Sequence, residues 1–589
     1  FFESDSYGQP DYFVPRVIEQ QTLALRPGER TDRYFPNKDS SNDVALYLGI
    51  RLVPQGSVAI FCGRKATASG MAARVVEIYE RGFSVAPPAA SANPDELRRM
   101  KNLVDGHFGE QAVRSRAASY GVFVHHGTTP HGLRLSIEYA MQQGRINFVA
   151  CTSTLAQGVN LPIRYLIVSG IRQGAEKIKV RDFQNLIGRA GRSGMHTEGL
   201  VIFSDPAVFD KRSQRTESGK FNSSVELLSS ALSESTTSSL LGLLAPILSG
   251  DGKGVVHVPA DALCRLMLSD EGTWLEWGNE VVSLNPQFRF DAKALVGELR
   301  SRRRLIFAIE SYLMANRGIG SHDEFKAEVE SLAASTLAYH LASDELKPAI
   351  RALFISVAEY LEEQEPATER QAAYSKTLLG VRSAKAVEQW VNENRDFLLT
   401  LDSNEDWLAT VWALFSAHSD DKFFHAVEPK SLAIQLATQW LQGSPYLMLF
   451  AHSSAEGGSR PWGAEKRRRL VEDDIVDFCE STLGFECSLV LAAVAQFLFG
   501  EHGIDDERSA ALTLFQKALK YGLPDWPSIS CYEFGFSDRV VAQHLCDAAR
   551  AEGFSGKLFA LALKLHRERI EAALKDYPSY FESVLEGRV

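Results

Sequence analysis

The sequence predicts an α/β lobe, in which a parallel sheet is covered by helices on both faces, followed by a mainly α-helical region. Between residues 57 and 206, short apolar runs alternate with longer amphipathic stretches. The short runs are apolar at consecutive positions, which is typical of parallel strands buried on both faces. Beyond residue 207, apolar residues recur at three- and four-residue spacing, which indicates amphipathic helices.

Each element of the lobe follows from a local pattern. The expected strands are 58–62, 122–124, 147–151, 165–168 and 200–203, and the expected helices include 66–81, 133–143 and 182–189. Ser40 is suited to cap a further helix that starts near Val44. Residues 84–106 look like an insertion. Residues 1–40 are rich in Pro, Gly, Asp and Asn, with a short strand-like run at 22–25, as expected of a connector.

The composition is that of an ordinary globular chain, long enough for roughly two to four domains. The seven cysteines are scattered and no CxxC pair occurs, so neither a zinc site nor a disulfide framework is indicated. Reduced thiols favour a cytoplasmic location. No run of consecutive apolar residues reaches the roughly 18 residues of a membrane span, so we expect no membrane association.

Basic residues are concentrated in the predicted lobe. The whole chain has a net charge of −11, yet residues 51–206 hold 19 Lys and Arg against 11 Asp and Glu. Phosphate binding depends on the local field, so a basic lobe within an acidic protein is compatible with a nucleic-acid partner. Chance clustering of charge is the alternative that the composition leaves open.

The segment 182–192, Asp-Phe-Gln-Asn-Leu-Ile-Gly-Arg-Ala-Gly-Arg, carries the strongest chemical signal. Arg189 and Arg192 are three residues apart, so a turn or helix end places them on one face. Their guanidinium groups suit phosphate oxygens and the negative charge that builds up during phosphoryl transfer. Gly188 and Gly191 allow a ligand close to the backbone. On spacing alone, an ordinary exposed helix terminus explains the pattern equally well.

Three further segments follow predicted strands, where the ligands of parallel sheets bind. Residues 151–162, Cys-Thr-Ser-Thr-Leu-Ala-Gln-Gly-Val-Asn-Leu-Pro, join a strand to a turn whose hydroxyl and amide groups suit a phosphate. Residues 124–127, Val-His-His-Gly, end a second strand. Residues 63–65, Gly-Arg-Lys, end a third.

Together these segments resemble the second RecA-like lobe of superfamily 2 helicases, nearest the Ski-like DExH branch. The matching segments are 59–65 as motif IV, 125–127 with Arg134 and Glu138 as the HH-A/G-G segment, 152–162 as motif V and 184–192 as motif VI. The likeness covers residues 57–206. Four motifs in the correct order make a chance match improbable.

The resemblance implies a role for each matching residue. Arg189 and Arg192 would be arginine fingers that reach the γ-phosphate of ATP on the other lobe, and Gln184 would contact the nucleotide or couple it to motif V. The other residues expected near the nucleotide are Gly158, Asn160 and Gly188. The expected contacts to the nucleic-acid backbone are Arg64, Lys65, His126, Thr152 and Thr154. ATP with Mg²⁺ is the implied cofactor, with its main ligands on the first lobe.

Two features of the lobe leave alternatives open. His125 and His126 could suggest a metal, but adjacent strand residues point to opposite faces and no Cys or carboxylate cluster accompanies them. A structural or phosphate-contacting role is favoured. Residues 168–180 could form the hairpin that related DNA helicases use to separate strands. The short turn at Gln173 and Gly174 favours a plain surface hairpin instead.

The nucleotide-binding half of such a helicase is not found in this sequence. It would need a Gly-rich loop ending in Lys and Ser or Thr, and a carboxylate pair for Mg²⁺. No Gly-Lys pair is followed by Ser or Thr, and no Asp-Glu pair continues as DExH or DExD. The start, Phe-Phe-Glu-Ser-Asp, has no initiator Met and no signal-peptide pattern. We therefore expect a chain that begins between the lobes, with ATP hydrolysis by the full-length protein or with a partner chain.

The resemblance also predicts how the chain is divided. The expected segments are 1–45 as a connector from a missing first lobe, 46–206 as the second RecA-like lobe, 207–320 as a linker with a winged-helix or helical domain, and 321–589 as a helical ratchet-like domain. The basic runs 302–304 and 466–469 could touch phosphate, although solvated helix faces are favoured. Residues 519–524 and 532–539 resemble the end of helicases from bacterial antiviral defence systems such as Hachiman.

The predicted function is an ATP-dependent helicase or translocase on DNA or RNA, with DNA favoured. A role in antiphage defence beside a nuclease subunit is the finer expectation. The alternative is a non-catalytic nucleic-acid scaffold or sensor with a helicase-like body. The intact arginine pair favours the motor, because a scaffold does not need it.

Overall fold

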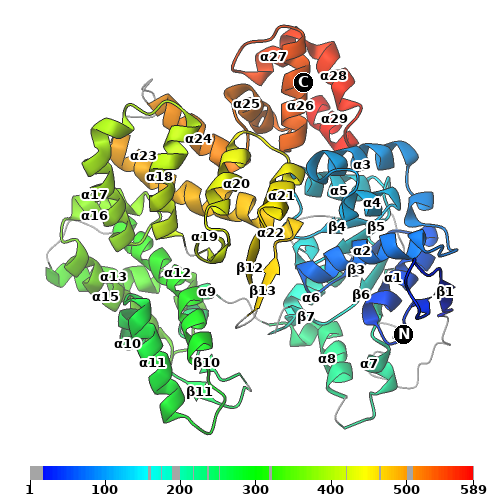
Figure 1. Ribbon diagram of the computed structural model, residues 1–589. Helices are drawn as coiled ribbons and strands as arrows, with labels where there is room; N and C mark the ends of the chain where they lie inside the picture. Colours follow the sequence, from blue (N-terminus) through cyan, green and yellow to red (C-terminus); the bar gives the residue numbers. More distant parts are fainter. Residues whose placement is uncertain are drawn as a thin grey trace. The chain divides into compact units, whose positions relative to one another are not determined.

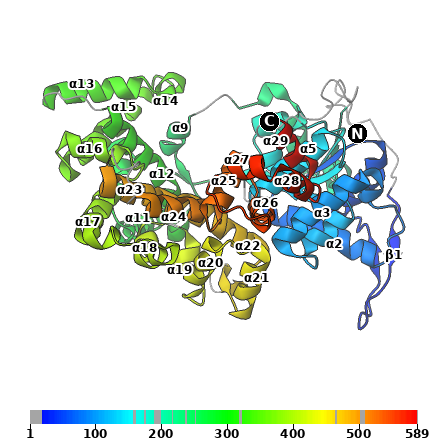
Figure 2. The same ribbon diagram turned by 90° about the horizontal axis from the view of Figure 1, so that it is seen from above.

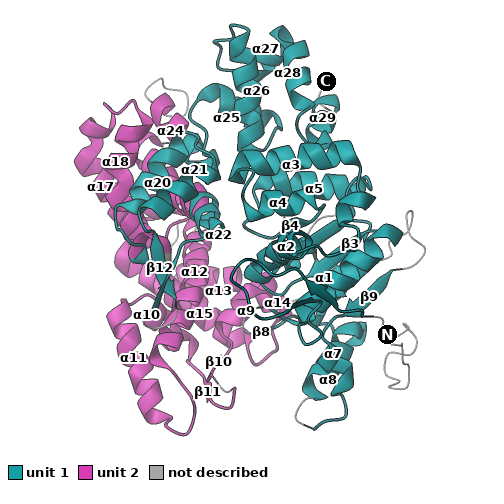
Figure 3. Ribbon diagram, turned by 45° about the vertical axis from the view of Figure 1, so that its right-hand side comes forward, with its two compact units in different colours: residues 1–234, 426–481, 517–589 teal, residues 235–425, 482–516 magenta. Residues whose placement is uncertain are grey.

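The computed structural model divides the chain into two compact units (Figure 3). Unit 1 comprises residues 1–234, 426–481 and 517–589, and unit 2 comprises residues 235–425 and 482–516. The structure describes residues 18–156, 161–173, 176–188, 199–215, 218–234, 238–250, 252–316, 322–419, 421–462, 466–500 and 509–587. The segment 321–589, which the sequence suggested as one domain, is thus shared between both units.

Five parallel strands form the sheet of unit 1, in the order β4-β5-β3-β6-β9. Figure 1 labels β3, β4, β5 and β6 of this sheet. The strands are β3 (Val58–Phe61), β4 (Phe123–His125), β5 (Phe148–Cys151), β6 (Tyr165–Val168) and β9 (Leu200–Phe203). The central strand β3 pairs with both β5 and β6, and Phe61 is the partner of Cys151 and of Val168. The prediction of five parallel strands is confirmed.

Helices cover both faces of this sheet, as the continuous apolar strands predicted. The helices α1 (Ser41–Leu52) and α2 (Lys65–Glu80) share a buried core with one face of the strands. On the other face, Phe183 of α6 (Val180–Ile187) stacks on Phe203 of β9. The Ser40 hydroxyl accepts a hydrogen bond from the Asp43 amide at 3.3 Å, which confirms the predicted cap of α1.

The predicted insertion at 84–106 is mostly helical. It contains the 3₁₀ turn η2 (Pro88–Ser91) and α3 (Pro94–Phe108), and α4 (Val113–Ser119) follows. The N-terminal connector holds a small antiparallel pair, β1 (Gln21–Leu23) with β2 (Arg33–Phe35). The hairpin predicted at 168–180 is present as β7 (Arg172–Gln173) and β8 (Glu176–Lys177), while residues 174 and 175 lie outside the described residues.

The later segments of unit 1 pack on the lobe, and Figure 2 shows α29 (Ser579–Glu586) beside α5 (His131–Gln142). The remaining helices and strands of unit 1 are α7 (Pro206–Asp210), α8 (Ser218–Leu228), α20 (Leu432–Leu441), α21 (Tyr446–Ala455), β12 (Ser459–Trp462), β13 (Lys466–Arg469), α22 (Glu472–Asp477), α25 (Trp526–Phe534), α26 (Arg539–Ala551), α27 (Phe559–Leu565), α28 (Arg567–Leu574) and α29 (Ser579–Glu586). Gly132 of α5 permits the closest approach, since a Cβ there would lie 2.2 Å from the Cβ of Asp538.

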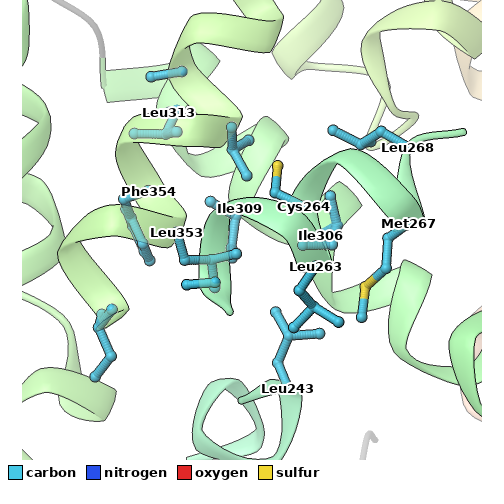
Figure 4. Close-up of a cluster of buried hydrophobic side chains, with 14 of the residues drawn as sticks. Leu243, Leu263, Cys264, Met267, Leu268, Ile306, Ile309, Leu313, Leu353 and Phe354 are labelled. Carbon is cyan, nitrogen blue, oxygen red and sulfur yellow. The ribbon is translucent and has the colours of Figure 1, made fainter. Parts of the chain in front are cut away.

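The described residues of unit 2 form helices and one short ribbon, β10 (Ile247–Leu248) paired with β11 (Val255–Val256). Its helices include α9 (Ser239–Leu243), α10 (Ala260–Met267), α11 (Glu271–Leu284), α12 (Ala292–Asn316), α13 (His322–Ala334), α14 (Leu337–Leu341), α15 (Lys347–Gln364), α16 (Thr368–Ser375), α17 (Val381–Leu398), α18 (Asn404–His418) and α19 (Lys422–Ala426). Figure 4 shows part of its core, in which Leu263 of α10, Ile306 and Ile309 of α12 and Leu353 of α15 lie together.

The two basic runs differ from expectation. Residues 466–469 lie on strand β13 rather than on a helix, and Arg468 is bound to Asp474 at 2.7 Å. In the other run, Arg302 is buried and donates to the carbonyl oxygens of Leu243 and Ala245. These two arginines therefore have structural partners within their own units.

A long helix runs from Glu472 to Phe499 through α22, a π-helical segment (Phe478–Cys487) and α23 (Ser488–Phe499). Among the described residues it is the one helix long and apolar enough to cross a membrane by length and composition. Glu480 and Glu486 interrupt its run of consecutive apolar residues, so the expectation of no membrane association stays a prediction. Half of its most apolar stretch is buried inside the protein, which is also the pattern of a core helix.

Candidate functional site

A cavity of about 360 Å³ lies at the carboxyl edge of the sheet, where β3, β6 and β9 end. Its basic side chains are Arg64, Arg172 and Lys220, and Lys220 also pairs with Asp205 at 3.1 Å. Gly63 is required here, because a Cβ would lie 1.7 Å from the carbonyl oxygen of Arg172. Parallel sheets bind ligands at this edge, and the basic lining suits an anion such as phosphate.

His125 connects the end of β4 to the loop that follows β5. Its Nδ1 lies 3.2 Å from Oγ1 of Thr154, and its Nε2 lies 2.7 Å from Oε1 of Glu138. Thr152 is nearly buried, with its Oγ1 3.3 Å from Oγ1 of Thr154. The two threonines predicted to contact a nucleic-acid backbone thus lie together, and His125, for which a structural or phosphate-contacting role was expected, contacts one of them.

His126 points to the opposite face, as expected for adjacent residues at a strand end. Its ring is fully buried, with Nε2 3.1 Å from the Ser69 hydroxyl and Nδ1 3.0 Å from the Thr128 hydroxyl. Burial lowers the pKa of His126 to about 3, and the positive charge of Arg114 acts in the same direction. A neutral, enclosed imidazole fits the structural alternative, and a nucleic-acid contact at His126 stays a prediction.

Asp473 of α22 completes this network from a distant part of the chain. Its carboxylate accepts hydrogen bonds from the hydroxyls of Ser69 at 3.0 Å and Thr128 at 2.8 Å, and it pairs with Arg114. Burial favours protonation, but Arg114, the His126 ring and the two hydroxyls outweigh it and hold the pKa of Asp473 below its usual range. Nothing in the sequence near Asp473 signals this partnership.

The remaining predicted residues are only partly accounted for. Lys65 lies 3.6 Å from Asp477 in an exposed ion pair, and Gln184 donates from Nε2 to the Leu227 carbonyl at 2.7 Å. Gly188 ends α6. The other four predicted nucleotide-site residues, Gly158, Asn160, Arg189 and Arg192, lie outside the described residues. Within the residues that the structure describes, no cluster of His, Cys, Asp and Glu could hold a metal ion.

Comparison with known proteins points to the same lobe. Residues 97–194 match the helicase conserved C-terminal domain family. The chain is 28% identical to Hachiman protein HamB of Bacillus cereus over 204 residues, which is 34% of this chain and 18% of HamB. It is 30% identical to the helicase POLQ-like protein of Caenorhabditis elegans over 167 residues, 28% of this chain and 18% of that protein.

A third relative is the ATP-dependent DNA helicase Hel308 of Thermoplasma volcanium, which is 27% identical over 179 residues, 29% of this chain and 24% of that protein. The chain therefore spans less than a quarter of the length of these three relatives. Residues 97–194, which lie within the five-stranded parallel α/β lobe, are therefore similar to the helicase conserved C-terminal domain, and a mainly helical region follows this lobe.

Proposed function

We propose that this chain is the second motor lobe and helical region of an ATP-dependent helicase or translocase of the Ski-like DExH branch. The observation that carries the proposal is the arrangement at the carboxyl edge of the sheet. There the basic cavity at Arg64 lies beside β3, and the Thr152–Thr154 loop follows its neighbour β5. One edge thus offers both hydroxyl and guanidinium donors to a phosphate backbone.

The chemistry is divided between two lobes. Arg189 and Arg192 would stabilise the negative charge that develops on the γ-phosphate of ATP–Mg²⁺ held by a first lobe, while Gln184, Gly188, Gly158 and Asn160 would line the nucleotide cleft. Opening and closing of that cleft would move the Thr152–Thr154 loop, with Arg64 and Lys65, along the strand. The hydrolytic step thus needs the first lobe, and this chain supplies the charge-stabilising half.

DNA is the favoured substrate, because one of the relatives, Hel308 of Thermoplasma volcanium, is an ATP-dependent DNA helicase. The likeness to Hachiman protein HamB supports a role in antiphage defence. That part of the proposal rests on likeness over a third of the chain. A cytoplasmic location and a nuclease partner subunit are further parts of the proposal.

The test is nucleic-acid-stimulated ATP hydrolysis by the full-length protein, with single-stranded DNA and RNA compared. We expect Arg192→Ala to lower stimulated hydrolysis at least about 100-fold while strand binding survives, since the arginine acts on the reacting phosphate. Arg64→Ala should instead weaken strand binding itself and reduce the dependence of binding on salt concentration.

The control is Arg51→Ala, which removes an exposed arginine at the end of α1, away from the cavity lining. It should leave both hydrolysis and binding unchanged. If the unmodified protein binds single strands but shows no stimulated hydrolysis, the motor proposal fails and a scaffold or sensor takes its place.

A further inference from the structure

A second cavity, of about 150 Å³, lies inside the helical unit 2. Residues from α10, α12, α15 and the start of α17 line it. Its polar and aromatic lining includes Glu310, Arg303, Arg382, Phe307 and Tyr360. None of these residues belongs to the lobe or to a motif of the proposed motor, so the cavity is a separate feature of the protein.

Glu310 is the unusual group in this cavity. Its side chain is 1% exposed, and Oε2 accepts a hydrogen bond from the Val381 amide at 2.7 Å, at the N-terminus of α17. Its other oxygen, Oε1, is buried without a hydrogen-bond partner among the described residues. Buried polar atoms are almost always satisfied, so a buried acceptor without a donor, on a residue that lines a cavity, indicates a missing partner.

Arginines and aromatic rings form the walls around this acceptor. The guanidinium group of Arg303 lies 5.1 Å from the ring centre of Trp274 and 5.5 Å from that of Phe307. Arg382 stacks over Tyr360 at 5.3 Å and donates from Nε and Nη1 to Gln364 and Leu268. Flat guanidinium and phenyl surfaces are what an unstacked base packs against.

Charge narrows the class of ligand. A metal ion would find one carboxylate oxygen, which is too few ligands, and the positive charges of two guanidinium groups would repel it. A small anion would be repelled by the buried carboxylate of Glu310. A neutral, planar molecule with a donor on one edge and acceptors on the other can bind the Glu310 carboxylate and a guanidinium group at the same time. Its size is limited, because the cavity is smaller than those that hold drug-sized ligands.

We propose that this cavity binds a single heterocyclic base, whose amino or ring N–H donates to Oε1 of Glu310 and whose carbonyl or ring nitrogen accepts from Arg382. Glutamate accepting from an amino group and arginine donating to base acceptors are the pairings found in base recognition. The inference rests on the proposed nucleic-acid substrate only for the source of the base, which is an unpaired base of a single strand.

The experiment is titration of the 589-residue chain at pH 8 with guanosine, adenosine, cytidine and uridine, followed by saturation-transfer NMR. Glu310→Gln is the decisive variant, because its amide oxygen can still accept from Val381 while its NH₂ group replaces the open acceptor with a donor. We expect at least one nucleoside to bind the unmodified chain, and Glu310→Gln to bind it at least about 10-fold more weakly.

The matched control is Glu276→Gln, which makes the same change of charge at an exposed position of α11 in the same unit. It should bind nucleosides as the unmodified chain does. A chain that binds none of the four at millimolar concentration, or variants that all bind alike, would overturn the proposal. Nucleoside binding needs no ATP hydrolysis, so this failure is distinct from failure of the motor.

An oligonucleotide with one such base among abasic sites identifies the source. Binding that is again weakened at least about 10-fold by Glu310→Gln supports a base presented by a strand. Binding of the free nucleoside alone would overturn the strand as the source.

Discussion

Two buried carboxylates, Asp538 in unit 1 and Glu310 in unit 2, each hold the N-terminus of a helix, yet they are in opposite states. Asp538 accepts from the amides of Val540 and Val541, and its second oxygen lies 2.9 Å from Nε2 of His107. Glu310 accepts from a single amide and has one open oxygen. The first site is complete within the chain, whereas the second lacks a partner.

The difference shows that burial alone does not determine the pKa of a carboxyl group. Burial raises the pKa of both groups, but His107 and the two amides outweigh it at Asp538 and hold that pKa below its usual range. At Glu310 burial prevails over one amide and Arg382, and the pKa rises to about 7. A buried carboxylate with partners for both oxygens stabilises the fold. A buried carboxyl group that lacks a partner for one oxygen indicates a candidate binding site.

The largest effect is expected from Asp538→Ala. Removal of one member of a buried pair leaves His107 without its partner and α26 without its cap, which should lower the free energy of unfolding by about 3–5 kcal/mol. Urea denaturation measures the loss, and hydrogen exchange should show it in α26 and α3. Asp547→Ala, an exposed carboxylate on the same helix, serves as the control and should change little. Equal losses in the two variants would contradict the comparison.

A smaller effect of opposite sign is expected from Glu310→Gln. Because the folded pKa is raised, the folded protein binds more protons than the unfolded chain between pH 4.5 and about 7, so stability falls as the pH rises through that window. The neutral variant escapes this loss. It should be more stable than the unmodified protein at pH 8 by at most about 3 kcal/mol, and nearly equal at pH 4.

Urea denaturation at the two pH values measures this second effect. Asp538 cannot produce the same trend, because its lowered pKa adds stability that is lost as the pH falls, which is the opposite sign. A Glu310→Gln variant that is less stable at pH 8 would mean that the open oxygen is satisfied in solution, and the contrast with Asp538 would disappear.

The smallest effect is expected from Asp473→Asn, where the carboxylate is 21% exposed. Arg114 and two hydroxyls satisfy it, so the loss should be about 1–2 kcal/mol, between a buried pair and a surface pair. Hydrogen exchange in α22 measures whether this segment detaches from the lobe. Asp477→Asn, which is 47% exposed beside Lys65, is the matched control and should leave the exchange unchanged.

The sheet could be predicted from the sequence because each strand is buried on both faces and therefore apolar at every position. The cap at Ser40 and the opposed histidines follow from equally local rules. The motifs placed the Thr152–Thr154 loop and Arg64 at one edge of the sheet, which the structure confirms. The nucleotide-site arginines fall outside the described residues, so their roles stay predictions.

The partnerships between distant residues could not be predicted in this way. His107 meets Asp538, 431 positions later, and His126 lies near Asp473, because helices from the end of the chain return to the lobe. Hydropathy patterns report which face is buried but not which partner covers it. Glu310 was missed for the same reason, since an acid on an amphipathic helix ordinarily points to water.

The seven cysteines are all buried, and burial raises the pKa of the Cys62 and Cys264 thiols to about 12. Thiols in this state react slowly, because the thiolate is the nucleophile. The native cysteines should therefore react little with maleimide reagents. Two cysteines introduced at exposed positions could carry a fluorescent dye pair, and movements of the protein could be followed one molecule at a time without first replacing the native cysteines.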